Sequence, residues 1–406
     1  MSTLLRLKDG REYIAVPSDW TEIINMVGSE LVTTDRETIL QLKDAPYKIG
    51  DCILDCWQGV YWLCKQSKLL KEPSVKQYHY DGPAIVVGSG PSMDLYLDKL
   101  RKWQGKALIV CAHTTANRLV DHGITPDIVT PVERVNISIN TKRPNKTFVK
   151  QTKLPNTTYG GLPLVPCDYK RYGSKMLVCS NDPVFTWAGC QDAQIFTGVT
   201  SGSAAVSVAK TIATGPLYLV GLDIVGNHFV GYDLNEDPLD AIVPMMCADG
   251  KERLGNTIKY RSCREIGIIA KGRDSYQCAP EGAMISGMTF RELPVPIDNN
   301  AKLVCNGGKN LDRFNNFQRL KRGVARQLVL SLDKCAAIKK AEDMHCGNLF
   351  DAEYTLLGTV LFRSLFAQIS METRFGMSPQ HALEWCKEAY RNAIEGIIGG
   401  ADEFSH

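Results

Sequence analysis

The sequence has no long apolar run and little net charge. No stretch reaches the ~18 consecutive apolar residues that indicate a membrane-spanning helix. The first residues, MSTLLRLKDGREY, introduce charges too early for the apolar core of a secretory signal. The 47 basic and 44 acidic side chains leave a net charge of only +3, so the total charge does not indicate a polyanionic partner. These absences favour a globular, cytoplasmic protein without a membrane span.

The sequence also lacks the cysteine spacings of zinc and redox sites. Its 14 cysteines are scattered, no C-x-x-C occurs, and the only close pair is Cys52 and Cys56. A chain of this length without a secretory segment is expected to keep its thiols reduced. We therefore expect cysteines that serve as small buried apolar residues rather than a disulfide framework or a metal site.

The length of 406 residues favours two or three domains. Residues 1–80 predict a small N-terminal α+β cap with a hairpin around Asp9-Gly10. Residues 81–300 predict a central domain. Residues 301–406 show long helical periodicity, which predicts a C-terminal helical domain used for packing or for homo-oligomer formation.

The central part alternates short apolar runs with segments of helical spacing. Such alternation is typical of a parallel sheet covered by helices on both faces, so we predict a Rossmann-like, doubly wound α/β domain. Ligands of such sheets bind at the carboxyl ends of the strands. The expected strands are 84–87, 107–111, 127–132, 175–180, 193–198 and 217–224, and the expected helices are 92–103, 114–122 and 201–213.

The first chemical segment is AIVVGSGPSMD, residues 84–94. A strand ends in Gly88-Ser89-Gly90-Pro91-Ser92, and a helix is expected to follow directly. Glycines allow a close approach of the backbone to a ligand, and free N–H groups at a helix start favour an anion. The segment is neither a complete G-x-G-x-x-G fingerprint nor a Walker A loop. A plain strand-to-helix turn is the alternative.

Two further segments carry polar residues after expected strands. The first is HTTANRLVDHGITPDIVTPVERVN, residues 113–136, in which Glu133 lies beyond the end of an expected strand. Its charge suggests contact with a polar ligand, and a surface ion pair is the alternative. The second is TGVTSGSAAVSVAKTIATGPLYLVGLDIVGNHFVGYD, residues 197–233. Thr200, Ser201 and Gly202 lie at the start of an expected helix, and Asp223 lies at the end of an expected strand. His228 lies five residues further on, where an imidazole suits general acid or base catalysis and a loop histidine without a catalytic role is the alternative.

In this order the three segments resemble the MptE-like (DUF115) domain. That domain is shared by motility-accessory-factor (Maf) flagellin glycosyltransferases and archaeal hydroxymethylpterin diphosphokinases. CAPEGAMISGM, residues 278–288, resembles the closing segment of the domain, and the resemblance spans about residues 80–295. The domain is also similar to a family of bacterial sialyltransferases that use CMP-sialic acid.

The resemblance implies roles for individual residues. His228 would be the base, with His113 or His122 as the alternative imidazole, and Tyr232 would donate to a phosphate. Asp223 and Glu133 complete the catalytic candidates. The expected nucleotide-binding residues are Gly88, Ser89, Gly90, Pro91, Ser92, Thr200, Ser201 and Gly202.

Two enzymatic functions and one binding function follow from these features. The leading hypothesis is a glycosyltransferase that moves a nonulosonate-like sugar from a nucleotide-sugar donor to a hydroxyl acceptor. The donor is expected to be CMP-linked, and the reaction is expected to require no cofactor. The alternative is diphosphate transfer from ATP, which needs Mg²⁺ held by Glu133 and Asp223. The third is a nucleotide-binding protein without catalysis.

One segment is strongly basic in this nearly neutral chain. Residues 134–175 contain nine basic side chains and a single acid, Asp168. The segment is either a solvated loop face or a surface for an acceptor, which would be a protein, a glycan or a nucleic acid.

Overall fold

The computed structural model describes residues 4–6, 12–15, 63–64, 66–132, 153–165, 169–180, 185, 188–198, 200–225 and 242–330. The chain folds into two compact units. The first comprises Met1–Ser67, Asp182–Cys190 and Leu311–His406, and the second comprises Lys68–Asn181 and Gln191–Asn310. The predicted domain boundaries at residues 80 and 300 remain predictions.

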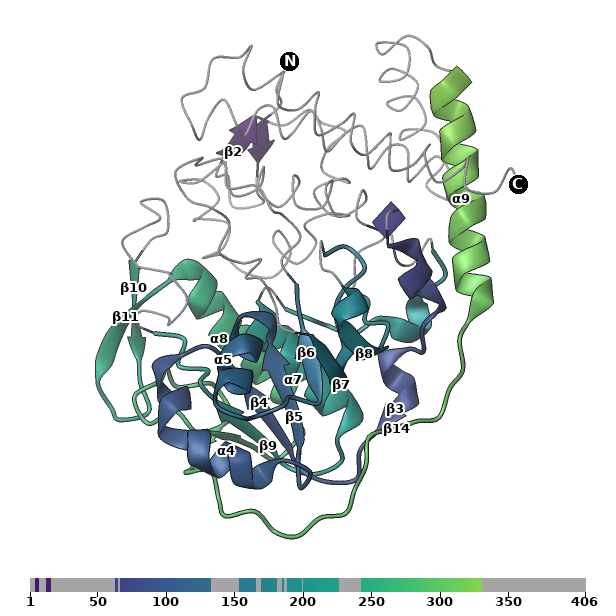
Figure 1. Ribbon diagram of the computed structural model, residues 1–406. Coiled ribbons are helices and arrows are strands. Elements are labelled where there is room, and N and C mark those ends of the chain that lie inside the picture. The colour runs from purple at the N-terminus through teal and green to yellow at the C-terminus, as the bar shows by residue number, and fades with distance from the viewer. Residues whose placement is uncertain are drawn as a thin grey trace. The chain divides into compact units, whose positions relative to one another are not determined.

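The second unit is built on an eight-stranded sheet with the order β13-β12-β9-β4-β5-β6-β7-β8 (Figure 1). Every pair of neighbouring strands is parallel. The predicted Rossmann-like α/β fold is therefore confirmed. The strands are β4 (Ala84–Val87), β5 (Leu108–Ala112), β6 (Ile128–Thr130), β7 (Leu154–Tyr159), β8 (Tyr172–Lys175), β9 (Leu217–Val220), β12 (Ser275–Gln277) and β13 (Thr289–Phe290).

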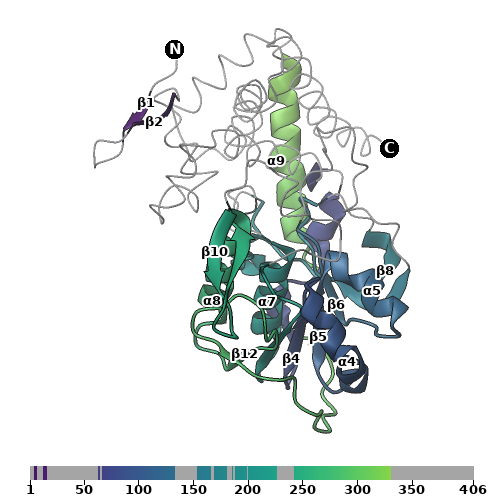
Figure 2. The ribbon, with the colours of Figure 1, turned by 90° about the vertical axis from the view of Figure 1, so that its left-hand side faces the viewer.

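Helices cover both faces of this sheet (Figure 2). On one face, α4 (Leu97–Trp103) and α5 (Ala116–Asp121) bury Leu100, Trp103 and Leu119 against alternate strand residues such as Ile85 and Ile109. The other face is covered by α7 (Ser201–Ile212), which packs against β4, β5 and α8 (Thr257–Ala270). Because both faces are buried, β4, β5 and β9 are apolar throughout and do not alternate with polar residues.

Short helices and strands complete the description. A hairpin of β10 (Ile242–Met246) and β11 (Glu252–Asn256) precedes α8, and β3 (Tyr78–His79) pairs with β14 (Val304–Cys305). The 3-10 helices are η1 (Ser67–Lys71), η2 (Val75–Gln77), η3 (Pro91–Tyr96), η4 (His113–Thr115), η6 (Tyr169–Arg171) and η7 (Gln191–Ala193).

The first unit contains two described elements that the sequence predicted. The hairpin around Asp9-Gly10 is present as β1 (Leu4–Arg6) and β2 (Glu12–Ala15). The start of the C-terminal helical region is α9 (Leu311–Leu330), which buries Phe314, Phe317 and Leu320 along one side. The rest of the predicted helical region, residues 331–406, lies outside the described residues.

Three expectations about local structure were wrong. The strand expected at 175–180 begins earlier and ends at Lys175, and residues 193–198 contribute only an isolated bridge between Gln194 and Cys179. No helix was expected between residues 225 and 300, but α8 lies within this range. Its apolar residues Cys263, Ile266 and Ile269 recur every three residues, which is the pattern that predicts a helix.

Cysteines behave as expected in the part of the chain that the structure describes. The eight described cysteines form no disulfide with one another, and all but Cys305 are buried. Among the described helices, none is both long and apolar enough to cross a membrane.

Asp127 ties the start of β6 to the start of β5. One of its carboxylate oxygens, Oδ2, accepts the Ile109 N–H at 2.7 Å. Burial raises the pKa of this carboxyl group to about 6, although the hydrogen bond from Ile109 lowers it in part. The folded protein therefore holds the Asp127 proton more tightly than the unfolded chain does.

We expect this carboxyl group to make the stability depend on pH. A raised folded-state pKa means that stability is highest below the unfolded pKa near 4 and is lost as pH rises towards 6, by up to about 3 kcal/mol. Asp127→Asn keeps an oxygen acceptor for Ile109 and cannot ionise. Urea unfolding between pH 4 and 7 should therefore give a flatter profile for the variant than for the unchanged protein. Parallel profiles would contradict this assignment.

Candidate active site

The sheet reverses its strand order at β4 and β9. From β4 the chain adds β5 and β6 on one side, and β9 and β12 pair on the other side. Crevices outside the carboxyl ends of the strands at such a reversal are the usual ligand sites of doubly wound folds. The segments Gly88–Ser92 and Gly221–Asp223 follow these two strand ends.

Gly88 and Gly221 allow the two strands to continue side by side past their ends. The Gly88 N–H donates to the Val220 carbonyl at 2.8 Å, and the Gly90 N–H donates to the Gly221 carbonyl at 2.7 Å. A Cβ on Gly88 would lie 2.5 Å from the Gly221 oxygen, and a Cβ on Gly221 would lie 2.5 Å from the Gly88 oxygen. Gly221 also has a φ of 66°, which favours glycine. Neither position has room for a side chain.

Asp223 holds the helix start that follows this contact. Its Oδ2 accepts the Ser92 N–H at 3.2 Å and the Ser92 hydroxyl at 2.9 Å. A Cβ on Gly90 would overlap this carboxylate, so the close approach requires glycine. Burial raises the pKa of Asp223, and the hydrogen bonds from Ser92 partly offset that rise.

This contact changes how the Gly88–Ser92 loop can bind a ligand. The Ser92 N–H belongs to the first turn of η3, where the helix has no acceptor of its own for it. The sequence predicted that this N–H would face a nucleotide phosphate. Asp223 already supplies the anionic acceptor, so the loop is closed by a carboxylate of the same chain.

The start of α7 is an intact capping box. The Thr200 side-chain oxygen accepts the Ser203 N–H at 3.1 Å, and the Ser203 oxygen accepts the Thr200 N–H at 3.0 Å. Thr130, at the end of β6, donates to the Ser201 carbonyl at 3.2 Å and to the Cys111 carbonyl at 3.1 Å. These bonds fix the helix start at the carboxyl edge of the sheet.

Leu222 links this helix start to the Gly88 loop. A Cβ on Gly88 would lie 2.6 Å from the Leu222 Cδ2 methyl, and a Cβ on Gly202 would lie 2.7 Å from the same methyl. One buried methyl group therefore packs against both glycines. The two segments that the sequence assigned to nucleotide binding thus lie on either side of Leu222.

The second helix at this edge, α8, was missed by the sequence analysis. It brings the Ser262 hydroxyl to 2.9 Å from the Thr200 side-chain oxygen. It also brings the buried Glu265, paired with Arg261 at 2.8 Å, against Gly198. Gly198 has a φ of 67°, and a Cβ there would lie 2.8 Å from the Glu265 Oε2.

A loop after β12 fastens the β10–β11 hairpin beside Asp223. The Ala283 N–H donates to the Asp223 carbonyl at 2.7 Å, and the Gln277 amide donates to the Ala283 carbonyl at 2.7 Å. The Met284 N–H then donates to the Met246 carbonyl of β10 at 2.8 Å. The glycine and alanine of the closing motif 278–288 therefore lie against the backbone of Asp223.

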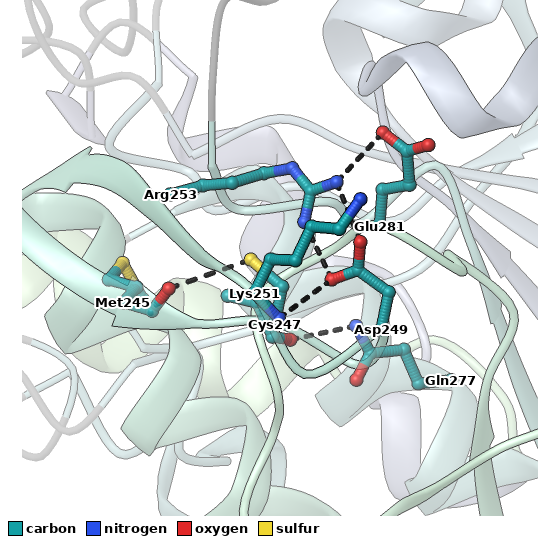
Figure 3. Close-up of polar contacts among 8 residues, drawn as sticks. Met245, Cys247, Asp249, Lys251, Arg253, Gln277 and Glu281 are labelled. Atoms are coloured by element: carbon teal, nitrogen blue, oxygen red, sulfur yellow. Dashed lines mark hydrogen bonds and ion pairs between the residues drawn. The ribbon is translucent and has the colours of Figure 1, made fainter.

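Charged residues hold the tip of this hairpin (Figure 3). The Arg253 guanidinium contacts both carboxylate oxygens of Asp249 at 2.7 and 2.8 Å and contacts Glu281 at 3.1 Å. The hydrogen bond from Arg253 lowers the pKa of Asp249 to about 2. The hairpin tip is thereby tied to the loop that contacts Asp223.

The remaining candidates lie in several places. Glu133, His228 and Tyr232 are outside the described residues, so their roles remain predictions. His113 is buried directly after β5, at the carboxyl edge. His122 follows α5 and precedes β6, so it lies at the opposite, amino-terminal edge and is removed as an alternative base.

The basic segment and the metal alternative are only partly described. Of the basic segment, Lys153, Lys170, Arg171 and Lys175 are described, and Lys175 lies over the Tyr169 ring at 6.0 Å. Within the described ranges, no three His, Cys, Asp or Glu side chains gather as a metal site.

Comparison with solved structures gives a neighbour with the same fold. The chain superimposes on a structure titled "Structure of MAf glycosyltransferase from Magnetospirillum magneticum AMB-1" with a TM-score of 0.53 and 13% sequence identity. The similarity covers 87% of this chain and only 60% of that chain. Comparison with curated proteins gives no match.

The family comparison agrees with the motifs. Residues 62–226, from before β4 to just after Asp223, match the family model described as 6-hydroxymethylpterin diphosphokinase MptE-like. The matched range contains the Gly88 loop, the start of α7 and both glycines of the β4–β9 contact. The resemblance predicted from the sequence is confirmed as far as residue 226, and the closing motif 278–288 lies beyond the matched range.

Proposed function

We propose that this chain is a glycosyltransferase that moves a sugar from a nucleotide-activated donor to a hydroxyl acceptor. The observation that carries the proposal is the placement of the Gly88 loop and the start of α7 on either side of Leu222, where the strand order reverses. The fold similarity to a Maf glycosyltransferase supports the same class of reaction.

In this proposal, the start of α7 binds the phosphate. The capping box uses the Ser203 N–H, whereas the N–H groups of Ser201 and Gly202 precede it and have no acceptor within the helix. Together with the positive end of the helix dipole they favour an anion. The Gly88 loop, closed by Asp223, then contacts the nucleoside through Ser89 and the exposed Pro91.

The chemistry is a substitution at the anomeric carbon. The acceptor oxygen forms the new bond, and the bond from the anomeric carbon to the phosphate oxygen breaks with its electron pair. The acceptor proton passes to a base, for which His228 is our candidate, and donors such as Tyr232 stabilise the departing phosphate. We assign a CMP-linked, nonulosonate-like sugar as the donor, because the motifs resemble those of CMP-sialic acid enzymes.

Diphosphate transfer from ATP is the second candidate function, since the family model carries the diphosphokinase description. That reaction would use Mg²⁺ to neutralise the phosphates. Asp223 and Glu133 are the carboxylates proposed to hold the ion.

The acceptor and the assembly complete the proposal. The basic segment 134–175 is proposed to contact an acceptor with negative charge. The C-terminal helical region is proposed to serve packing or self-association.

The two reactions differ in nucleotide and metal dependence. We expect isothermal titration to detect CMP binding with and without Mg²⁺, and incubation with a CMP-activated sugar and an alcohol acceptor to release CMP. Binding of ATP only with Mg²⁺, followed by AMP release, would favour diphosphate transfer. No binding of CMP, CDP, UDP or ATP would refute both reactions.

We expect Asp223 to support the Gly88 loop. Asp223→Ala leaves the buried Ser92 N–H without its acceptor, so the free energy of unfolding in urea should fall by about 1–3 kcal/mol. The same variant should bind CMP more weakly. Asp223→Asn keeps one oxygen acceptor, so its free energy of unfolding should stay within about 1 kcal/mol of that of the unchanged protein. Asp98→Ala, at an exposed site of α4, is the control. An Asp223→Ala variant as stable as the control would disprove this role.

We expect His228 to act on the acceptor rather than on the donor. His228→Ala should lower turnover by roughly 10²–10⁴-fold, the usual range for loss of a general base, with little change in CMP affinity. His122→Ala removes an exposed imidazole at the opposite edge and should retain activity. Full turnover in the His228 variant would exclude it as the base, and His113 would be tested next.

A further inference from the structure

The hydroxyl of Ser262 makes its hydrogen bond to Thr200 across the interface between α8 and α7. The two side-chain oxygens lie 2.9 Å apart. Ser262 is 5% exposed, whereas Thr200 is half-buried. Among the residues that the structure describes, Thr200 is the only hydrogen-bond partner of the Ser262 side chain. The contact therefore joins a buried hydroxyl to one that solvent or a ligand can reach.

Thr200 and Ser203 of the capping box and Ser262 each carry one hydroxyl proton. The Ser203 hydroxyl donates to the Thr200 carbonyl at 2.8 Å and accepts the Thr200 N–H, so its single proton is used. The Thr200 oxygen accepts the Ser203 N–H. Only the protons of the Thr200 and Ser262 hydroxyls are left to assign.

Burial decides the direction of the bond between them. A buried hydroxyl that does not donate loses a hydrogen bond that water would have supplied. Thr200 is the available acceptor for Ser262, so Ser262 donates to Thr200. The Thr200 oxygen then accepts two hydrogen bonds, and its own proton is left for a group on the open side.

We propose that Ser262 is a positioning residue that keeps the Thr200 proton available to an anionic oxygen of the bound nucleotide. This inference rests on the proposed function, in which that anion lies at the start of α7. Without Ser262, the Thr200 hydroxyl can instead turn to the Ser203 oxygen, which lies 3.1 Å away. On the same helix, Glu265 pairs with Arg261 and lies against Gly198, next to the capping box.

The test compares Ser262→Ala with Ser207→Ala in the full chain. Ser207 is a buried serine further along α7, so its variant controls for the loss of a buried hydroxyl. The Kd for CMP, or for whichever of CDP, UDP and ATP the unchanged protein binds, is measured by titration. Loss of one ordinary hydrogen bond predicts a rise of roughly three- to tenfold for Ser262→Ala, and Ser207→Ala should show no rise.

A second variant and a kinetic readout keep the role separate from folding. Ser262→Cys retains a weak donor and should give an intermediate Kd. In turnover assays, the donor KM should rise while kcat changes less. Melting temperatures of the three variants should agree with one another.

The outcomes separate this inference from the proposed function. Unchanged or tighter nucleotide binding by Ser262→Ala would overturn the positioning role and leave the proposed function standing. Equal losses in the Ser262 and Ser207 variants would also overturn it, because the effect would then be structural. A complete absence of nucleotide binding by the unchanged protein would overturn both.

Discussion

The contact between Gly88 and Gly221 is the constraint on which the candidate site depends. Two parallel strands normally diverge into separate loops at their ends, but here β4 and β9 stay hydrogen-bonded through Gly90. The backbones approach so closely that a Cβ on either glycine would meet the other's carbonyl oxygen. This approach places Leu222 against Gly202 and places Asp223 over the start of η3. A larger residue at either position would separate the strand ends and move both groups at once.

The position of Asp223 follows from that contact, and its carboxylate sets the charge at the Gly88–Ser92 loop. Its carboxylate occupies the position at a helix start that an anionic ligand would otherwise take. A phosphate placed there would face a second negative charge at hydrogen-bonding distance. The start of α7 has no described carboxylate on its first N–H groups, so it is the more favourable place for the phosphate. In the proposed function, the Gly88 loop would then contribute mainly through its shape.

The sequence predicted the fold better than the details of the site. Apolar runs such as AIVV and LYLV predict buried parallel strands directly, since a strand covered on both faces needs no polar alternation. The helix start at Thr200 could be predicted because a capping box is a local pattern. In contrast, α8 was missed because charged residues such as Arg261 and Glu265 lie among its few apolar positions, and the burial of Glu265 is visible only in three dimensions. The Asp223–Ser92 contact spans 131 residues, so no local pattern could indicate it.

The donors described at the start of α7 are neutral, and this limits how a phosphate can be bound there. Backbone N–H groups, hydroxyls and a helix dipole worth roughly half a unit charge do not neutralise even a singly charged phosphate diester. Asp223, which lies across Leu222 from this helix start, has the wrong sign. The two candidate reactions differ in how much positive charge they need at this position. Diphosphate transfer would use Mg²⁺ to neutralise the phosphates. Glycosyl transfer needs less positive charge, because its leaving nucleoside monophosphate carries fewer charges than the phosphates of ATP. Neutral hydroxyl donors of defined direction, such as Thr200 backed by Ser262, therefore suit the glycosyl reaction better.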